Sequence, residues 1–162
     1  NVMASRGSVI PKFLQQKNTG LITITDKNMT RFNMKMQEAI ECVIWILANC
    51  EGGEIVIPKA PSYKILDLKK AIAPHAKIKV IGTRLGEKLH EELITSSDAS
   101  TVYDIGKYYI NLSNVNEKYV KRYVKKYKAK KVKENFIYNS LNNERYLKVN
   151  DLRNLTKKIQ KN

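Results

Sequence analysis

The sequence predicts an α+β fold built from short helices and short strands. Segments with helical spacing of apolar residues alternate along the chain with short β-branched runs. No G-x-G-x-x-G loop follows any predicted strand, so the fingerprint of a dinucleotide-binding domain is missing from the sequence. The 162 residues, 43% of them hydrophobic, suffice for one domain with a modest core and are too apolar for a disordered chain.

The first 50 residues carry the clearest element signals. A short helix should begin near Pro11, whose missing N–H suits a first turn, and should end at Gly20. A strand at residues 21–25 and a turn at 26–28 follow, and then the longest helix, at 33–50. The apolar face of that helix repeats at helical spacing, at Ile40, Val43, Ile44 and Leu47.

The rest of the chain predicts shorter elements. Strands are expected at residues 54–57, 77–81 and 108–112. Helices are expected at residues 64–73, 86–94 and 149–155. Tyr119, Tyr123 and Tyr127 fall four residues apart, which places them on one stripe of a further helix.

The positive charge is concentrated near the C-terminus of the sequence. The chain has 30 Lys and Arg against 15 Asp and Glu, a net charge of +15. Residues 1–100 have a net charge of +4 and residues 101–162 of +11, with nine basic residues and one acid in 117–133. Such a segment could bind nucleic acid or an anionic membrane, or it could be a solvated face of a helix that docks through its tyrosines. The longest apolar stretch has seven residues, at 42–48, and is too short for a membrane span of about 20.

Few residues suggest catalysis or metal binding. His75 and His90 stand alone, and no Cys/His spacing typical of a metal site occurs. Cys42 and Cys50 are expected to be buried, reduced thiols. We therefore predict neither catalytic nor metal-binding residues.

Arginine is the more informative cation, because the chain has 24 Lys and only six Arg. Three of the arginines, Arg6, Arg31 and Arg84, lie in predicted loops. The planar guanidinium suits bidentate phosphate binding, although ordinary surface salt bridges are the alternative interpretation.

Four ordered motifs resemble a known family. They are NVMASRGSVIP, ITDKNMTRF, GEIVIPK and RLGEKLHEE, at residues 1–11, 24–32, 53–59 and 84–92. Together they resemble the C-terminal half of the inverting UDP-N-acetylglucosamine 4,6-dehydratases, which are extended short-chain dehydrogenases/reductases. Residues 136–140 and 147–153 resemble the end of such polysaccharide-biosynthesis proteins.

The resemblance implies a small substrate-binding subdomain of an extended short-chain dehydrogenase, without its Rossmann domain. Residues 1–115 would form the nucleotide-sugar-binding subdomain, and residues 116–162 a basic C-terminal extension with helices. The full-length enzyme would be a cytoplasmic homo-oligomer that binds UDP-N-acetylglucosamine and uses NADP or NAD. It would take a hydride from C4 of the sugar, remove water across C5 and C6, return the hydride to C6 and invert C5. The product would enter surface-polysaccharide or flagellin sugars.

The resemblance and the arginine argument together give a set of candidate substrate-binding residues. They are Asn1, Arg6, Ser8, Val9, Ile24, Thr25, Arg31, Arg84 and Glu87. By resemblance, Arg31 and Arg84 clamp the diphosphate, and Asn1 bonds the diphosphate region. The loop around Ser8 and Val9 meets the nucleotide, and Ile24 and Thr25 line the base. Glu87 touches the ribose or orients Arg84.

The sequence departs from the family where catalysis is concerned. The family's Tyr-x-x-x-Lys and Asp-Lys pairs lie upstream of the Asn-Val motif, and nothing here precedes Asn1. We interpret Tyr103/Lys107, Tyr127/Lys131 and Asp26-Lys27 as chance matches in the wrong place. The expectation is a fragment that binds no dinucleotide, turns over nothing alone and leaves apolar faces exposed. The competing hypothesis is a small basic nucleic-acid-binding protein that uses the Lys/Tyr-rich tail.

Overall fold

The structure, a computed structural model, describes residues 2–159 and divides the chain into two compact units. Unit 1 consists of Asn1–Met36, Ala60–Glu91 and Ser140–Asn162, and unit 2 of Gln37–Lys59 and Glu92–Asn139. The mixture of helices and short strands confirms the predicted α+β class. The functional division at residue 115 stays a prediction.

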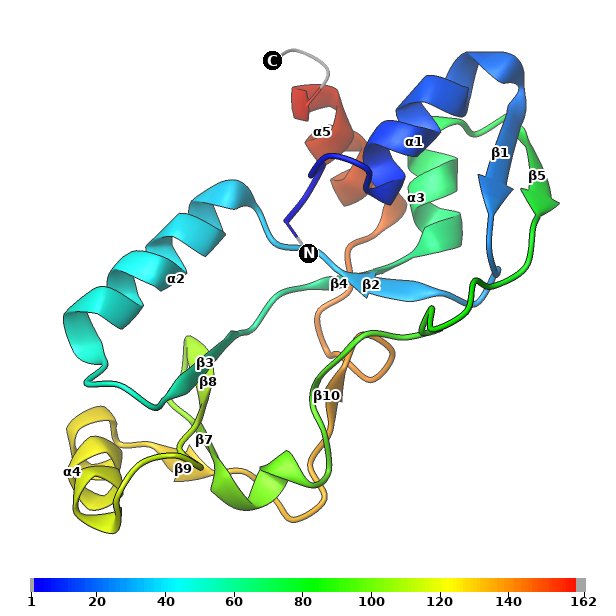
Figure 1. Ribbon diagram of the computed structural model, residues 1–162. Coiled ribbons are helices and arrows are strands. Elements are labelled where there is room, and N and C mark those ends of the chain that lie inside the picture. The colour runs from blue at the N-terminus through cyan, green and yellow to red at the C-terminus, as the bar shows by residue number, and fades with distance from the viewer. Residues whose placement is uncertain (1, 160–162) are drawn as a thin grey trace. The chain divides into compact units, whose positions relative to one another are not determined.

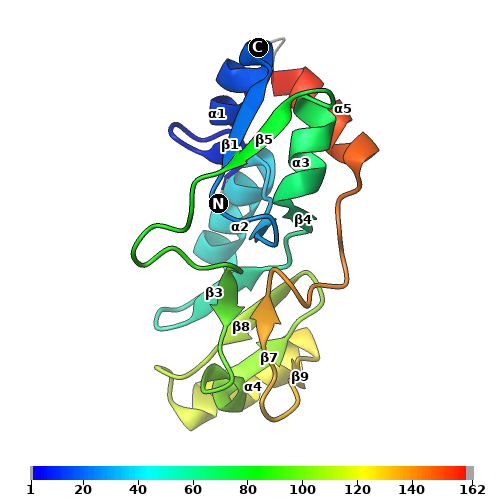
Figure 2. The same cartoon turned by 90° about the vertical axis from the view of Figure 1, so that its right-hand side faces the viewer.

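Unit 1 places helices beside a parallel pair of strands, as Figure 1 and Figure 2 show. Its elements are α1 (Val9–Gln16), the short 3-10 helix η1 (Lys17–Thr19), β1 (Leu21–Ile24), β2 (Thr30–Phe32), β4 (Ser62–Lys64), α3 (Ile65–Ile72), β5 (Lys77–Val80) and α5 (Val149–Ile159). β1 and β5 pair in parallel, and β2 and β4 pair antiparallel with Arg31 opposite Tyr63. This second pair fixes the backbone on either side of Arg31.

The core of unit 1 comes from the apolar stripes that the sequence predicts. α1 buries Ile10 and Phe13, and Gly20 ends the segment after η1 in the left-handed conformation, with φ +72°. α3 buries Ile65, Leu68 and Ile72, and Leu152 of α5 packs into the same cluster. Burying a side chain of this size contributes about 1.5–3 kcal/mol, so these contacts hold the unit together.

Unit 2 contains a four-stranded antiparallel sheet in the order β3-β8-β7-β9. Its elements are α2 (Met36–Asn49, of which Met36 belongs to unit 1), β3 (Ile55–Pro58), β6 (Glu92–Ile94), the 3-10 helix η2 (Asp98–Thr101), β7 (Val102–Asp104), β8 (Tyr108–Asn111), α4 (Glu117–Tyr127), β9 (Lys130–Lys131) and β10 (Tyr138–Asn139). α4 begins at Asn116, whose side-chain oxygen accepts the Tyr119 N–H at 2.8 Å. The tyrosine stripe faces inward, with Tyr119 and Tyr123 buried against Ile110 and Leu112.

The predicted helix at residues 86–94 is wrong. Residues 92–94 form strand β6, and the residues before it bond to β2. The Thr30 N–H donates to the Leu89 carbonyl at 3.2 Å, and the Phe32 N–H donates to the Glu91 carboxylate at 2.7 Å. These tertiary bonds override the helical spacing. The pairing of β2 with β4 was also missed, because each strand has only three residues.

The apolar face of α2 is exposed. Val43, Ile44 and Leu47 are 55%, 60% and 79% exposed, whereas Cys42 on another side of the helix is buried. Apolar residues at helical spacing therefore predicted the helix correctly, but in this chain they do not cover a core. The expectation of exposed apolar faces is confirmed.

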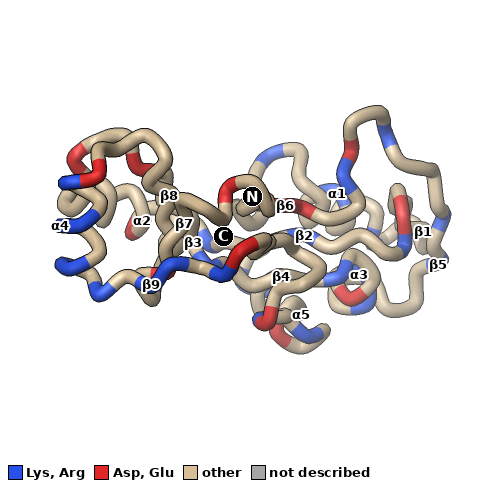
Figure 3. The backbone as a smooth tube through the Cα atoms, turned by 90° about the horizontal axis from the view of Figure 1, so that it is seen from below, with Lys and Arg blue, Asp and Glu red and all other residues tan. Residues whose placement is uncertain are grey.

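The two units divide the charge differently from the two halves of the sequence. Unit 1 has 19 basic and 6 acidic residues, a net charge of +13, and unit 2 has 11 basic and 9 acidic residues, a net charge of +2. Figure 3 marks the lysines along α4 and β9, which belong to unit 2. Unit 2 also contains the acidic residues of α2 and its following loop, so the lysine-rich segment does not make its own unit strongly basic.

Both cysteines have free thiols. Cys42 is buried and Cys50 is half-buried, and burial raises the pKa of each thiol.

None of the helices within residues 2–159 is long and apolar enough to cross a membrane.

Candidate functional site

Unit 1 contains a cleft made of two adjoining cavities of about 250 and 160 Å³. Both cavities are lined by Val9, Arg31 and Glu87, which joins them into one site. The larger cavity is further lined by Val2, Met3, Ala4, Ser8, Ile10, Phe32, Asn33 and Tyr63. The smaller is further lined by Gly7, Lys12, Phe13, Thr23, Ile24, Thr25, Met29, Ile65 and Arg84.

Arg31 lies at the centre of this cleft because β2 presents it there between buried neighbours. Its Nη1 donates to the carbonyl oxygens of Thr30 at 2.8 Å and Leu89 at 3.0 Å. Its Nη2 donates to Met29 Sδ at 3.2 Å and to Glu87 Oε1 at 3.4 Å. The guanidinium is thereby fixed in plane, with one edge against a carboxylate.

Glu87 connects the two arginine-bearing segments. Oε1 of its carboxylate contacts Arg31 and also accepts from the Thr25 hydroxyl at 3.3 Å, while Oε2 accepts the backbone N–H of Arg84 at 3.2 Å. Gly86 just before it adopts φ +77°, which lets the loop turn toward the cleft. The Glu87 carboxylate thus bonds the backbone of the Arg84 loop, and both roles that the resemblance implies for Glu87, toward the ribose and toward Arg84, stay predictions.

A buried hydroxyl network behind Arg31 was not visible in the sequence. Ser140 Oγ lies 2.6 Å from Thr30 Oγ1 and accepts the Glu91 N–H at 2.9 Å. Thr30 Oγ1 in turn lies 2.8 Å from His90 Nδ1. Ser140 and Thr30 are 0% and 1% exposed, so their bonds are shielded from water. The network ties the C-terminal segment to both sides of Arg31, and the motif at residues 136–140 revealed none of these partners.

Seven of the nine candidate residues line the cleft. They are Ser8, Val9, Ile24, Thr25, Arg31, Arg84 and Glu87. Arg6 is exposed and is not among the lining residues, and Asn1 lies outside the described residues. The sequence therefore predicted which segments meet, although the binding roles of their residues stay predictions.

Ser8 Oγ is buried and has no hydrogen-bond partner among the described residues. Ser8 precedes α1 as its N-cap but makes no side-chain cap bond. A buried hydroxyl without a partner costs free energy that a bound polar group would recover. This is the behaviour expected of a ligand-contacting residue in the larger cavity.

The cleft offers binding groups more than catalytic ones. Burial raises the pKa of the Tyr63 hydroxyl far above its usual range, the Glu91 charge raises it further and Arg31 opposes both. Tyr63 therefore stays protonated near neutral pH. Within residues 2–159, no group of three or more His, Cys, Asp or Glu side chains could hold a metal ion. The arrangement suits recognition of an anion with attached hydroxyl and apolar groups.

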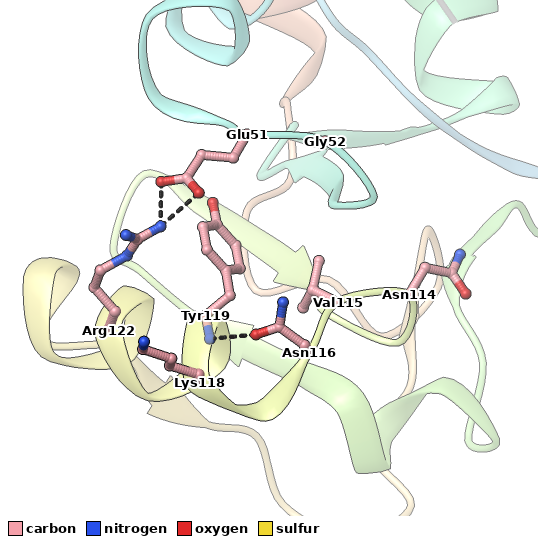
Figure 4. Close-up of a pocket in the computed structure, with 8 residues that line it drawn as sticks. All are labelled: Glu51, Gly52, Asn114, Val115, Asn116, Lys118, Tyr119 and Arg122. Atoms are coloured by element: carbon pink, nitrogen blue, oxygen red, sulfur yellow. Dashed lines mark hydrogen bonds and ion pairs between the residues drawn. The ribbon is translucent and has the colours of Figure 1, made fainter.

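Unit 2 contains a larger cavity, of about 510 Å³, which Figure 4 shows. Glu51, Gly52, Asn114, Val115, Asn116, Lys118, Tyr119 and Arg122 line it. Its Arg122 guanidinium is already paired with the Glu51 carboxylate, and both side chains are largely exposed. This cavity has less to offer an anion than the unit 1 cleft, because unit 2 has a net charge of only +2, against +13 for unit 1.

Comparisons with known proteins agree with this geometry. The chain is 39% identical over 155 residues to an inverting UDP-N-acetylglucosamine 4,6-dehydratase of Campylobacter jejuni, covering 88% of this chain and 45% of that protein, in its C-terminal part. It is 42% identical over 114 residues to a UDP-glucose 4-epimerase of Rickettsia canadensis, covering 67% of this chain and 33% of the relative. The chain thus spans less than half the length of the curated relatives it matches.

A solved structure shares the fold over nearly the whole chain. The X-ray structure of Pen from Bacillus thuringiensis superposes with a TM-score of 0.80 and 32% sequence identity, covering 99% of this chain and 47% of that one. The polysaccharide biosynthesis protein family matches residues 1–113, which include all the candidate residues. The resemblance drawn from the four motifs is confirmed, and the chain belongs to the polysaccharide biosynthesis protein family.

Proposed function

We propose that this chain is the UDP-sugar-binding part of a UDP-N-acetylglucosamine 4,6-dehydratase that inverts C5. The observation that carries the proposal is the meeting of Arg31, Arg84 and Glu87 at one cleft. The unit around the cleft has a net charge of +13, which attracts a nucleoside diphosphate. Relatives named as dehydratases and as epimerases both act on UDP-sugars, so the UDP moiety has the broadest support.

The chain's own residues would bind and orient the nucleotide. Arg31 and Arg84 would face the diphosphate, and Ser8 Oγ would gain the partner it lacks. Ile24 and Thr25 would lie along the base, at the end of β1. Asn1 and Arg6 would add contacts from the N-terminal segment.

The dinucleotide is proposed to bind the part of the full-length enzyme that this chain does not match. Among residues 2–159, neither strand of the parallel β1–β5 pair leads through a glycine-rich loop into a helix, so the residues present do not fit a dinucleotide. NADP or NAD would supply the hydride chemistry at C4 and C6 in that enzyme. We propose accordingly that this chain alone turns over nothing.

The exposed apolar face of α2 supports a missing partner. Ile44 and Leu47 would pack against the Rossmann half of the full-length enzyme, which we propose to be a cytoplasmic homo-oligomer serving surface-polysaccharide or flagellin sugars. In its absence the same face would favour self-association.

The nucleic-acid alternative loses its main structural argument. Tyr119 and Tyr123 are buried, and the Tyr127 hydroxyl donates to Asn49 at 2.9 Å. Single-stranded nucleic acid binds by stacking its bases on exposed aromatic rings, and these rings are turned into the unit.

Isothermal titration of UDP tests the proposal. Arg31→Ala and Arg84→Ala should each weaken binding about tenfold or more, the effect expected on losing hydrogen bonds to a charged group. Arg122→Ala is the matched control, because it removes an arginine from the unit 2 cavity, and it should leave binding unchanged. Equal losses in all three variants would contradict the proposed site. Turnover of UDP-N-acetylglucosamine and NADP by the chain alone, followed by mass spectrometry, would contradict the proposal that it is inactive.

A further inference from the structure

The outer side of α4 is cationic along its whole length. The helix buries Tyr119 and Tyr123. Lys118, Lys121 and Lys125, spaced three and four residues apart, form an exposed stripe on the opposite side. Exposed lysines continue past the end of α4 into β9, as Figure 3 shows. Together these side chains form the lysine face, which consists of Lys118, Lys121, Lys125, Lys126, Lys128, Lys130, Lys131 and Lys133.

The charges of the lysine face are not paired with carboxylates. Within residues 2–159, none of its lysines makes an ion pair. Acids of unit 2 are held by other cations, as in the pairs Glu41–Lys107 and Glu51–Arg122. A charged surface acts on a partner within about one Debye length, about 8–10 Å at physiological salt. The small net charge of unit 2 as a whole therefore does not remove this local excess of positive charge.

The lysine face offers positive charge and few other binding groups. Over residues 117–127, all of which the structure describes, every exposed side chain is charged, so α4 has no exposed apolar group to insert into a lipid layer. The rings of Tyr119 and Tyr123 are buried and are not available to stack on bases. Lysine is a hydrated point charge without the planar fork that gives arginine its phosphate geometry. Such a face fits a broad anionic surface that requires neither apolar nor directional contacts.

We propose that the lysine face binds the surface of an anionic lipid bilayer by electrostatic attraction, without insertion. Clusters of about four to eight basic side chains hold a protein segment at such a surface. The inference goes beyond the proposed function, because the bilayer is a second partner and no residue of the lysine face lines the unit 1 cleft.

Co-sedimentation of the full chain with lipid vesicles tests the inference. The chain should bind vesicles that contain about 30% phosphatidylserine and should not bind vesicles of phosphatidylcholine alone. Raising the salt concentration from about 0.1 M to about 0.5 M should abolish the binding, because salt screens the attraction and no apolar contact replaces it.

The decisive variant removes four lysines of α4 and is compared with the removal of four lysines elsewhere. The combined changes Lys118→Gln, Lys121→Gln, Lys125→Gln and Lys126→Gln should weaken vesicle binding about 100-fold or more, because each lysine near an anionic bilayer contributes roughly fivefold. The matched control replaces four exposed lysines of unit 1, which lie on three different elements, and should weaken binding less than about fivefold; they are Lys17, Lys77, Lys79 and Lys157. Arginine at the same four positions of α4 keeps the charge and should keep the binding.

Several results would overturn the inference. They are absent binding to the anionic vesicles, equal losses in the two glutamine variants, and loss of binding in the arginine variant. Tighter binding of an RNA duplex than of the vesicles at the same salt, lost in the α4 glutamine variant, would assign the lysine face to nucleic acid instead. Circular dichroism checks that each variant is folded. UDP takes no part in these measurements, so a failure of this inference leaves the proposed function standing.

Discussion

Replacing Ser140 by alanine should destabilise the chain far more than the loss of one hydroxyl suggests. The side chain is 0% exposed, and its Oγ bonds the Thr30 hydroxyl at 2.6 Å and the Glu91 N–H at 2.9 Å. The amide of Glu91 would be left without this partner, at a cost of about 1–3 kcal/mol, and the bond to Thr30 would be lost at about 0.5–1.5 kcal/mol. Thr30 keeps its contact with His90, so the expected total is about 2–3 kcal/mol.

Urea unfolding followed by far-ultraviolet circular dichroism measures this loss of unfolding free energy. Ser113→Ala, at an exposed position, is the control and should change the free energy by less than about 0.5 kcal/mol. Ser140→Ala combined with Thr30→Val should be less destabilising than the sum of the single changes, because both remove the same bond. A loss for Ser140→Ala as small as that of the control would refute the reasoning that the hydroxyl network holds the segments around Arg31 together.

Three further predictions concern unit 2. Gly53→Ala should lower the free energy of unfolding by about 2–3 kcal/mol, because its φ is +90° and the new Cβ would lie 2.9 Å from the backbone oxygen of Asn114. Gly106→Ala is the comparison: its φ is +86°, but its Cβ would lie in open space, so it should cost about 1 kcal/mol. Leu47→Lys should reduce self-association in size-exclusion chromatography with light scattering without lowering the unfolding free energy, and an unchanged mass above that of the monomer would contradict this. Burial of the Glu54 carboxylate opposes its ionisation, but hydrogen bonds from the Tyr119 hydroxyl and from backbone N–H groups outweigh burial and lower its pKa. The ionised Glu54 carboxylate therefore contributes to the free energy of unfolding above about pH 4.3, and this contribution is lost as the pH falls through the lowered pKa. In Glu54→Gln, the free energy of unfolding measured with urea should fall less steeply as the pH is lowered.

Local signals in the sequence predicted the helices and strands well where the apolar residues of a segment pack into the hydrophobic core of the same unit. The helix near Pro11, the strand after Gly20 and the tyrosine stripe at Tyr119 and Tyr123 are all present. The same reasoning failed at residues 86–94, where a helix was expected. There the Glu91 carboxylate accepts the Phe32 N–H of β2. Spacing alone cannot reveal such a tertiary partner.

The candidate site was predictable in its segments and not in its connections. Arginine scarcity and the motifs indicated Arg31 and Arg84, and both line the cleft. The partners of Arg31 could not be read from the sequence, because Glu87 lies 56 positions away and the Ser140–Thr30 bond spans 110. The distribution of charge between the two units also could not be predicted from the sequence. The strongly basic unit is unit 1, which contains Arg31 and Arg84.

Two-dimensional ¹H–¹⁵N NMR of the 18.6 kDa chain during a UDP titration tests directly whether UDP binds the unit 1 cleft. We expect shifted backbone amides at Val9, Thr25 and Arg84, and unshifted amides at Asn116 and Lys118 beside the unit 2 cavity. Shifts confined to the unit 2 cavity, or no shifts at millimolar UDP, would contradict it.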